Sequence, residues 1–224
     1  MPNLYSAFPQ WITLTWAVGL ALVVSPASAQ QYVYAGLFGE NAYEIQVRKQ
    51  SGVLILEEEK RYSKHTFHSE MGTEKWVLRD EKENHDFTAQ RTGNQIRVSG
   101  TFQGKSIEKT VNLEEGLWFN KLDHGLSEFA ASDQQEISFW ALKLMSDLDP
   151  LKLNAKKVSR ETLDISGQTY QAVKVKLTID NFMLSKLWSA ELWYRASDGL
   201  FLRYEGANGG PGTPKTIIEL DNEG

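Results

Sequence analysis

The sequence contains no cysteine in its 224 residues. In a protein that leaves the cytosol, this absence excludes a disulfide framework, a thiol nucleophile and thiolate metal ligands. It also excludes an N-terminal lipid anchor, because that anchor is built on a cysteine directly after the signal sequence. If the chain is exported, it therefore depends on an ordinary hydrophobic core for its stability.

Charged residues are missing from the first 29 positions, which contain no Lys, Arg, Asp or Glu. The apolar run of residues 11–24 is followed by Ala27 and Ala29, the small residues that a signal peptidase requires. The run is shorter than the roughly 20 residues that a membrane-spanning helix needs. We therefore predict a signal peptide over residues 1–29, cleaved before Gln30, with retention as a membrane anchor as the alternative.

The remaining segment, residues 30–224, has the size of one domain, and a chain of that length buries roughly 70% of its unfolded surface. Because the leader carries no charge, the whole net charge of −5 belongs to this segment. Basic and acidic residues alternate along it without a basic patch, so we expect no nucleic-acid partner. We expect a single β-rich domain in the periplasm, without stable membrane insertion after the signal is removed.

Apolar and polar residues alternate with period two along most of the segment, which is typical of half-buried strands. Tyr43, Ile45 and Val47 begin the pattern, and a Ser-Gly turn leads into an apolar partner at 53–56. Asp198-Gly199 is a strong hairpin signal between two later strands. Further strands are predicted near 76–78, 86–89, 96–102, 107–113, 161–165, 170–179, 190–195, 200–205 and 216–220. The fold class is therefore mainly β (α+β): a curved antiparallel sheet or half-barrel meander.

One segment departs from this period. The apolar residues of 133–148 that fall at helical spacing are Ile137, Trp140, Ala141, Leu144 and Leu148. Polar residues at 132–136 suit a capping box, and Asp149-Pro150 suits a helix end. We predict one central helix over residues 133–148, packed against the concave face of the sheet.

The C-terminal part of the chain contains a recognisable set of strand and turn segments: Asp164–Tyr170 followed by Val173, Glu191–Arg195, Asp198–Leu200, Arg203–Glu205 and Thr216–Leu220. With these segments the chain resembles, over roughly residues 130–220, a bacterial family of exported domains of unknown function. It implies a curved antiparallel sheet related to the periplasmic lipoprotein-carrier fold, in a Gram-negative periplasm. It carries no catalytic residue over to this chain.

Motifs for catalysis or metal binding are weak. His65 and His68 would point to opposite faces of a strand, whereas zinc needs three or four converging ligands, so both are interpreted as polar surface residues. His85 and His124, each beside an aspartate, are interpreted as polar loop residues. Ser106-x-x-Lys109 lies in a predicted strand instead of at a helix start, and the glycine-rich run 206–212 lacks a phosphate-loop lysine. We predict no catalytic residue, no metal and no cofactor, and a protein that is not an enzyme.

Aromatic and apolar residues supply the remaining functional signal. The predicted ligand-binding residues are Trp140 and Leu144 on the helix, and Phe182, Met183 and Trp188 in the least polar stretch outside it. The first hypothesis is a non-enzymatic binder or carrier of a lipid or other amphipathic molecule. The alternative is an envelope interaction or scaffold protein that engages another protein through a sheet edge or loops. An enzyme is a third hypothesis, without a motif to support it.

Overall fold

The computed structural model describes residues 29–69, 72–144, 146–207 and 213–224. The predicted signal peptide therefore lies outside the described residues, apart from its last residue, Ala29. Within the described residues, no helix is both long enough and apolar enough to span a bilayer.

Strands account for most of the described chain, as the period-two alternation predicts. The first eight are β1 (Gln30–Phe38), β2 (Asn41–Gln50), β3 (Val53–Glu58), β4 (Arg61–His68), β5 (Gly72–Asp80), β6 (His85–Thr92), β7 (Gln95–Phe102) and β8 (Lys105–Asn112). They are followed by β9 (Leu117–Trp118), β10 (Glu136–Leu142), β11 (Pro150–Ile165), β12 (Gln168–Ile179), β13 (Ser189–Arg195), β14 (Phe201–Ala207) and β15 (Lys215–Glu223). The prediction of a mainly β protein is confirmed.

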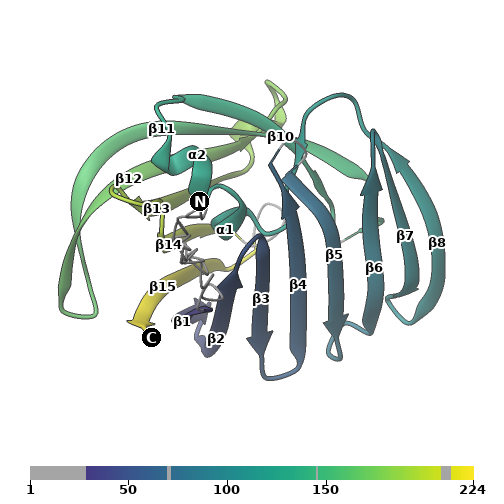
Figure 1. Ribbon diagram of the computed structural model, residues 1–224, viewed down its shortest axis with the longest axis horizontal. Coiled ribbons are helices and arrows are strands. Elements are labelled where there is room, and N and C mark those ends of the chain that lie inside the picture. The colour runs from purple at the N-terminus through teal and green to yellow at the C-terminus, as the bar shows by residue number, and fades with distance from the viewer. Residues whose placement is uncertain (1–28, 70–71, 145, 208–212) are drawn as a thin grey trace, which may run out of the picture.

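The strands form a closed barrel with a side branch. In the described chain the sheet runs from β4 through β3, β2, β1 and β15 down to β9 and β5, and β5 pairs again with β4. Strands β6, β7 and β8 extend from β5 outside this ring of 12 strands (Figure 1). The prediction of an open curved sheet or half-barrel is therefore wrong, because the strands close into a ring. Two pairings of β9, with β5 and with β10, are parallel, and the other pairings are antiparallel.

The predicted central helix over residues 133–148 is also wrong. Residues 136–142 form β10, which pairs with β11 from Glu136↔Lys156 to Leu142↔Pro150. Phe139 and Ala141 belong to the barrel core, while Trp140 and Leu142 pack in a second core beside it. Because both faces of residues 139–142 are covered, the apolar residues there are consecutive, and such a run resembles a helical stripe.

Helical structure is found elsewhere, in α1 (Leu122–Gly125), α2 (Ser127–Ala131) and the 3-10 turn η1 (Leu184–Lys186). Both α1 and α2 lie within the ring of strands, in the middle of the view (Figure 1), and they contact β14 and β13. Leu126, Phe129 and Ala130 are buried there in the barrel core. A helical segment does fill the concave side of the sheet, but it comes from 122–131.

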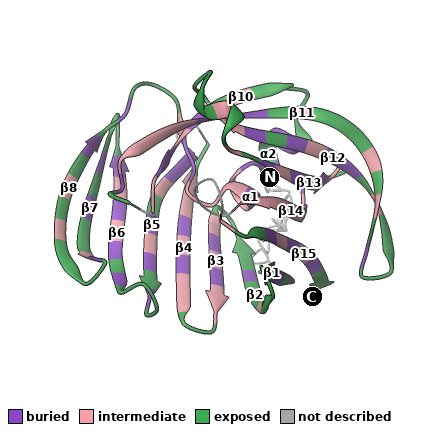
Figure 2. Cartoon of the chain, turned by 180° about the vertical axis from the view of Figure 1, so that it is seen from behind, coloured by how far each residue is buried: buried purple, intermediate pink, exposed green. Residues whose placement is uncertain are grey.

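Two hydrophobic cores hold the domain together. The larger core fills the barrel with inward side chains from β1, β2 and β10–β15, together with α1 and α2. The smaller core lies between the branch β5–β8 and the segments around Trp118 and Leu148. Along many strands buried residues alternate with exposed ones (Figure 2), so the outward faces of β11 and β12 remain available to solvent.

Candidate functional site

The structure separates the five residues that the sequence analysis assigns to a ligand site. Phe182 and Met183 lie on the connection between β12 and β13, with 80% and 73% of their surface exposed. Trp188 is half-buried against the barrel core, and its Nε1 donates a hydrogen bond to the carbonyl of Ala207 at 3.0 Å. Trp140 and Leu144 pack against the second core, not on a shared helix. The predicted helix face that would join them to a ligand therefore does not exist.

Residues 181–188, here called the apolar loop, have a backbone fixed by polar contacts. The Asn181 side-chain oxygen accepts hydrogen bonds from the backbone N–H groups of Met183 at 3.0 Å and Leu184 at 3.1 Å. The Ser185 hydroxyl donates to the carbonyl of Phe182 at 3.0 Å. Asparagine is favoured at such positions because its side chain bonds to the backbone two and three residues ahead. The loop therefore displays its apolar side chains on a defined scaffold.

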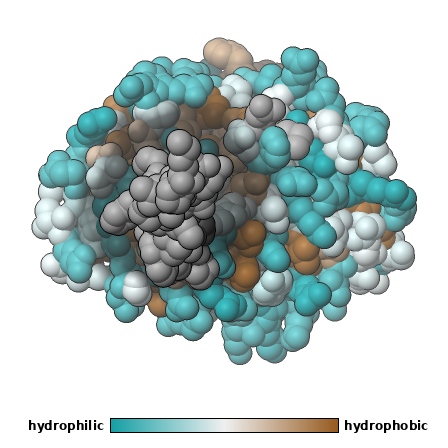
Figure 3. All heavy atoms as spheres, in the orientation of Figure 1, coloured by the Kyte–Doolittle hydropathy of each residue, from teal (hydrophilic) through white to brown (hydrophobic). Residues whose placement is uncertain are grey.

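The apolar loop exposes more hydrophobic surface than any other described segment of its length. Besides Phe182 and Met183, Leu187 is 59% exposed and Leu184 is 42% exposed. The Lys186 ammonium lies 4.5 Å from the centroid of the Phe182 ring, which is a cation–π contact. Contiguous exposed apolar residues of this kind mark interaction or ligand sites. Apolar atoms are visible at the upper edge of a largely hydrophilic face (Figure 3).

An open groove of about 400 Å³, here called the outer groove, lies beside the loop on the outward face of β10–β12. Its apolar lining comes from Val158, Ile179 and Phe182, and its floor includes the paired residues Asn154 and Thr178. A volume in this range is typical of sites for small molecules. The groove thus combines an apolar wall from the loop with a polar floor from the sheet.

Two lysines line the outer groove. The Lys156 ammonium lies 3.9 Å from the Glu136 carboxylate, whereas Lys176 has no ion pair among the described residues. At the end of the groove nearest Trp140, Lys152 pairs with Asp180 at 3.7 Å and lies over the Trp140 ring at 5.5 Å. Lys176 is therefore the cation best placed to receive an acidic group. The sequence analysis did not select it, although it follows directly from the outward phase of the alternation in β12.

In the described part of the chain, no group of three or more His, Asp or Glu side chains converges in a way that could hold a metal ion. The interpretation of His65 as a surface residue is wrong, since it is 1% exposed. Its Nε2 lies 2.8 Å from the Ser63 hydroxyl, which also accepts a hydrogen bond from Trp76 Nε1 at 3.0 Å. The His65 tautomer sets which of the two groups donates in the Ser63–His65 hydrogen bond. Burial lowers the pKa of His65 to about 3.

His85 and His124 also differ from the predicted loop residues. His85 begins β6, is buried, stacks on Phe102 and accepts a hydrogen bond from the backbone N–H of Gln103 at 3.1 Å. His124 lies in α1, where burial lowers its pKa to about 4. Its ring contacts the rings of Tyr34 and Phe201, each at 5.3 Å between centroids.

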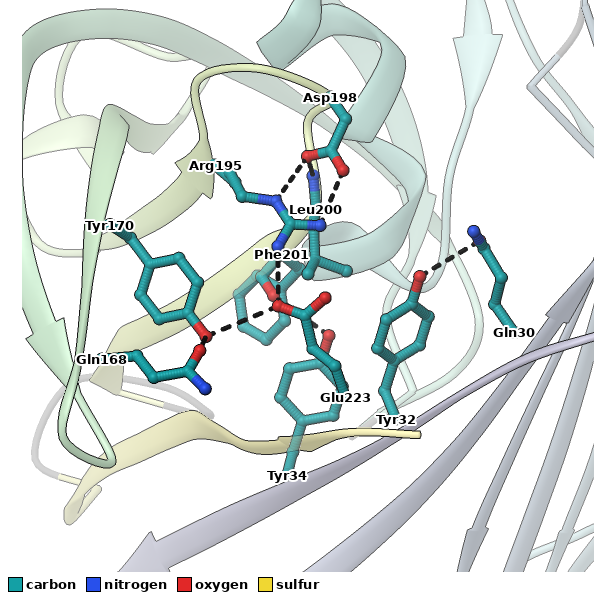
Figure 4. A network of polar contacts seen from close by, with 10 residues as sticks. All are labelled: Gln30, Tyr32, Tyr34, Gln168, Tyr170, Arg195, Asp198, Leu200, Phe201 and Glu223. Carbon is teal, nitrogen blue, oxygen red and sulfur yellow. Dashed lines mark hydrogen bonds and ion pairs between the residues drawn. The ribbon is translucent and has the colours of Figure 1, made fainter.

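A polar network closes the barrel end near the start of β1 (Figure 4). Arg195 donates two hydrogen bonds to Asp198, at 2.9 and 2.7 Å, and one to Glu223 at 2.6 Å. These bonds lower the pKa of Asp198, and they raise the pKa of Arg195. Tyr170 extends the network with hydrogen bonds to Gln168 and Glu223. The network ties β12, β13 and β15 together.

The sequence matches no protein-family model and no curated protein. Among solved structures, the fold is similar to a β-barrel-like protein of domain of unknown function DUF1849 from Brucella abortus, with a TM-score of 0.53 and 9% identity over 87% of this chain and 96% of that one. This likeness confirms at the level of the fold the predicted resemblance to a domain of unknown function.

Two further neighbours have lower scores. The hypothetical lipoprotein YmcC from Escherichia coli has a TM-score of 0.37 and 12% identity, over 89% of this chain and 91% of that one. A LolA superfamily protein from Nitrosomonas europaea has a TM-score of 0.27 and 10% identity, over 89% and 86%.

Proposed function

We propose that this protein is an exported, non-enzymatic binder or carrier of a lipid or other amphipathic molecule. The observation that carries the proposal is the apolar loop beside the outer groove. Phe182 and Met183 are largely exposed on a hydrogen-bonded backbone, and Lys176 lies in the adjoining groove without an ion pair in the described chain. This arrangement offers apolar and cationic contacts side by side, which is what an amphipathic ligand requires.

The ligand would lie on the outside of the barrel, because α1, α2 and the larger core fill the inside. Its apolar chain would contact Val158, Ile179 and Phe182, and an acidic head group would approach Lys176. Met183 would form the rim, where its flexible and polarisable side chain adapts to different chains. Trp140 would lie beyond the Lys152–Asp180 pair, at the far end of the same outward face.

A second candidate function, engagement of another envelope protein, is favoured by the edge of the side branch. Strand β8 pairs with β7 on one side and has no strand on the other among the described residues. Such an edge accepts an extended peptide by strand addition, although charged residues including Lys105, Glu108 and Lys109 discourage non-specific pairing. This candidate needs no small-molecule ligand.

Titration with a fluorescent fatty acid tests the first proposal. We expect saturable uptake by the unmodified protein and a loss of about tenfold or more in affinity for Met183→Asp, with an unchanged melting temperature. The matched control is Leu37→Asp, because Leu37 is another exposed apolar residue, at 40%, on β1. Its affinity should stay unchanged.

Native mass spectrometry of protein purified from its own cell envelope provides a second measurement. A retained apolar ligand supports the carrier proposal. The absence of uptake across a panel of fatty acids and phospholipids would remove that proposal and leave the β8 edge as the leading candidate.

A further inference from the structure

A second pocket, here called the barrel-end pocket, lies where β1 begins and the β13–β14 turn approaches α2. It encloses about 140 Å³ and is separate from the outer groove, with which it shares no lining residue. Its lining includes Tyr32 from β1, Val47 and Lys49 from β2, His124 and Ser127 from the two short helices, and Phe201 from β14. Residues from four regions of the sequence thus converge on one small space.

Three of the polar side chains that line this pocket, those of Lys49, His124 and Ser127, have no hydrogen-bond or ion-pair partner among the described residues. No described residue forms a hydrogen bond with the ring nitrogens of His124 or the hydroxyl of Ser127, and Lys49 has no ion pair in the same part of the chain. Partly buried polar groups normally find partners within the protein or in solvent. The pocket therefore presents three polar groups that are free to bind a ligand.

The single carboxylate in the described pocket lining, that of Asp198, is bound to other groups of the protein. Asp198 accepts two hydrogen bonds from Arg195 and one from the backbone N–H of Leu200 at 3.1 Å, so its oxygens are already engaged (Figure 4). Lys49, in contrast, lies near enough to His124 and Asp198 to influence the pKa of both. Lys49 is the one cationic side chain in the described lining of the pocket.

The His124 ring is held in place at the pocket by two aromatic neighbours. It makes edge contacts with Tyr34 and Phe201 at 5.3 Å. Burial keeps it neutral at pH 7, so that it offers one N–H and one acceptor nitrogen. The side chains of Val47, Leu200 and Phe201 supply apolar surface around these polar groups.

We propose that the barrel-end pocket binds a small organic carboxylate, whose charged group contacts Lys49, His124 and Ser127 and whose short alkyl chain lies against Val47 and Phe201. A water molecule occupies about 30 Å³ of the liquid, so the pocket has the volume of roughly four or five waters. This volume suits a carboxylate with a few carbon atoms. It is too small for the long chain expected in the outer groove.

Butyrate is the probe for the first experiment, with ¹H–¹⁵N NMR shifts of the full mature protein as the readout. We expect saturable shifts at His124 and Ser127, and weakening by about tenfold or more in Lys49→Met. The matched control, Lys60→Met, changes an exposed lysine in the turn between β3 and β4 and should bind as the unmodified protein does. Because Lys49 is exposed, its replacement should not impair folding, which the NMR spectrum itself checks.

Butylammonium and inorganic phosphate are the comparison ligands. Butylammonium has a similar alkyl chain with the opposite charge and should cause no saturable shift. Equal binding of butyrate and phosphate would overturn the assignment to a carboxylate with an apolar chain. Absence of saturation by butyrate, or equal binding by Lys49→Met, would overturn the site itself. None of these outcomes depends on fatty-acid uptake at the outer groove.

Discussion

Gly72 of β5 pairs with Trp118 of β9 at the point where the barrel closes. Gly72 has a φ of +76°, and a Cβ atom built on it would lie 2.5 Å from the carbonyl oxygen of Trp118. Both the backbone conformation and the close approach therefore require glycine. The same strand continues along β6 from Lys75 to Asp80, so the sheet divides at this residue into the ring and its side branch.

Gly72→Ala should therefore destabilise the protein by more than about 2 kcal/mol, because it combines an unfavourable φ with a backbone clash. Chemical denaturation measures the loss. Gly93→Ala is the matched control: its φ is +58°, but no atom lies within 4 Å of the added Cβ, so it should lose only about 1 kcal/mol. Equal losses of unfolding free energy in the two variants would show that the close contact between Gly72 and Trp118 does not require glycine.

The local parts of this fold were predictable from the sequence, and the closure was not. The hairpin from Tyr43 to Leu56 and the turn at Asp198-Gly199 are each specified by residues close in the chain. The pairing of Gly72 with Trp118 joins segments that are distant in sequence, and no periodicity encodes it. The segment 133–148 was misassigned because residues 139–142 of β10 are covered on both faces, which removes the alternation that identifies a strand.

The candidate site shows the same division. The exposed apolar stretch at Phe182 and Met183 is recognisable as an apolar run between two strands, and its role in ligand binding stays a prediction. The predicted relation of Trp140 and Leu144 to this stretch depends on a helix over 133–148, which the structure replaces by β10 and the loop after it. The burial of His65 had a signal, since Ser63, His65 and Phe67 share one phase of β4, and that phase is the inward one for the first two. The barrel-end pocket depends on how α1 and α2 pack, which no local pattern specifies.

Leu148 and Leu144 should differ in their contribution to stability. Leu148 is fully buried in the second core, whereas Leu144 is only partly buried at its margin. Leu148→Ala should cost about 2–5 kcal/mol, the range for core leucines. Leu144→Ala should cost roughly 1–2 kcal/mol, because less surface returns to water. Urea denaturation of both variants tests the order, and a greater loss for Leu144→Ala would contradict the packing described for this loop.

Acid should destabilise the domain through its buried histidines. Burial lowers the pKa of His65 from 6.5 to about 3. The charges of Lys121, His124 and Arg61 also lower this pKa, and the charge of Asp123 raises it. Between about pH 6.5 and pH 3, His65 is protonated in the unfolded state and neutral in the folded state. The free energy of unfolding therefore falls as the pH is lowered through this window. For His65 alone the loss from pH 7 to pH 4 is about 3 kcal/mol.

Denaturation midpoints of His65→Phe across this pH range measure that contribution. Above pH 6.5 the variant should be less stable than the unmodified protein only through the lost hydrogen bond to Ser63. Between pH 6.5 and 4 its free energy of unfolding should fall less steeply with decreasing pH than that of the unmodified protein. His68→Phe changes an exposed histidine of the same strand and should keep the original slope. An unchanged slope in His65→Phe would show that this residue is not the source.

Export and cleavage of the signal peptide are predictions that can be tested on protein isolated from cells. Ala27 and Ala29 satisfy the small-residue requirement of the signal peptidase, so protein recovered from the periplasm should begin at Gln30. N-terminal sequencing, with allowance for cyclisation of an N-terminal glutamine, is the measurement. Recovery of a chain that begins at Met1 in the membrane fraction would favour the retained anchor instead.

The outer groove should distinguish an acid from an alcohol with the same chain. Lys176 is exposed on β12 and has no ion pair in the described residues, while Lys174 on the same strand is paired with Glu191 at 2.9 Å. If Lys176 receives the head group, Lys176→Met should weaken binding of a fluorescent fatty acid by about fivefold to tenfold, which corresponds to roughly 1 kcal/mol for one partly exposed charge pair. Binding of the matched fatty alcohol should hardly change.

Lys75→Met provides the control for that comparison, because Lys75 is an exposed lysine on β5, a strand that does not line the outer groove. A general effect of net charge would weaken the acid equally in both lysine variants, since each removes one positive charge from a protein of net charge −5. If only Lys176→Met weakens fatty-acid binding, and if this variant binds the acid and the matched alcohol equally well, the head group lies beside Lys176. Equal losses in the two variants would remove Lys176 from the site, even if uptake at the apolar loop were intact.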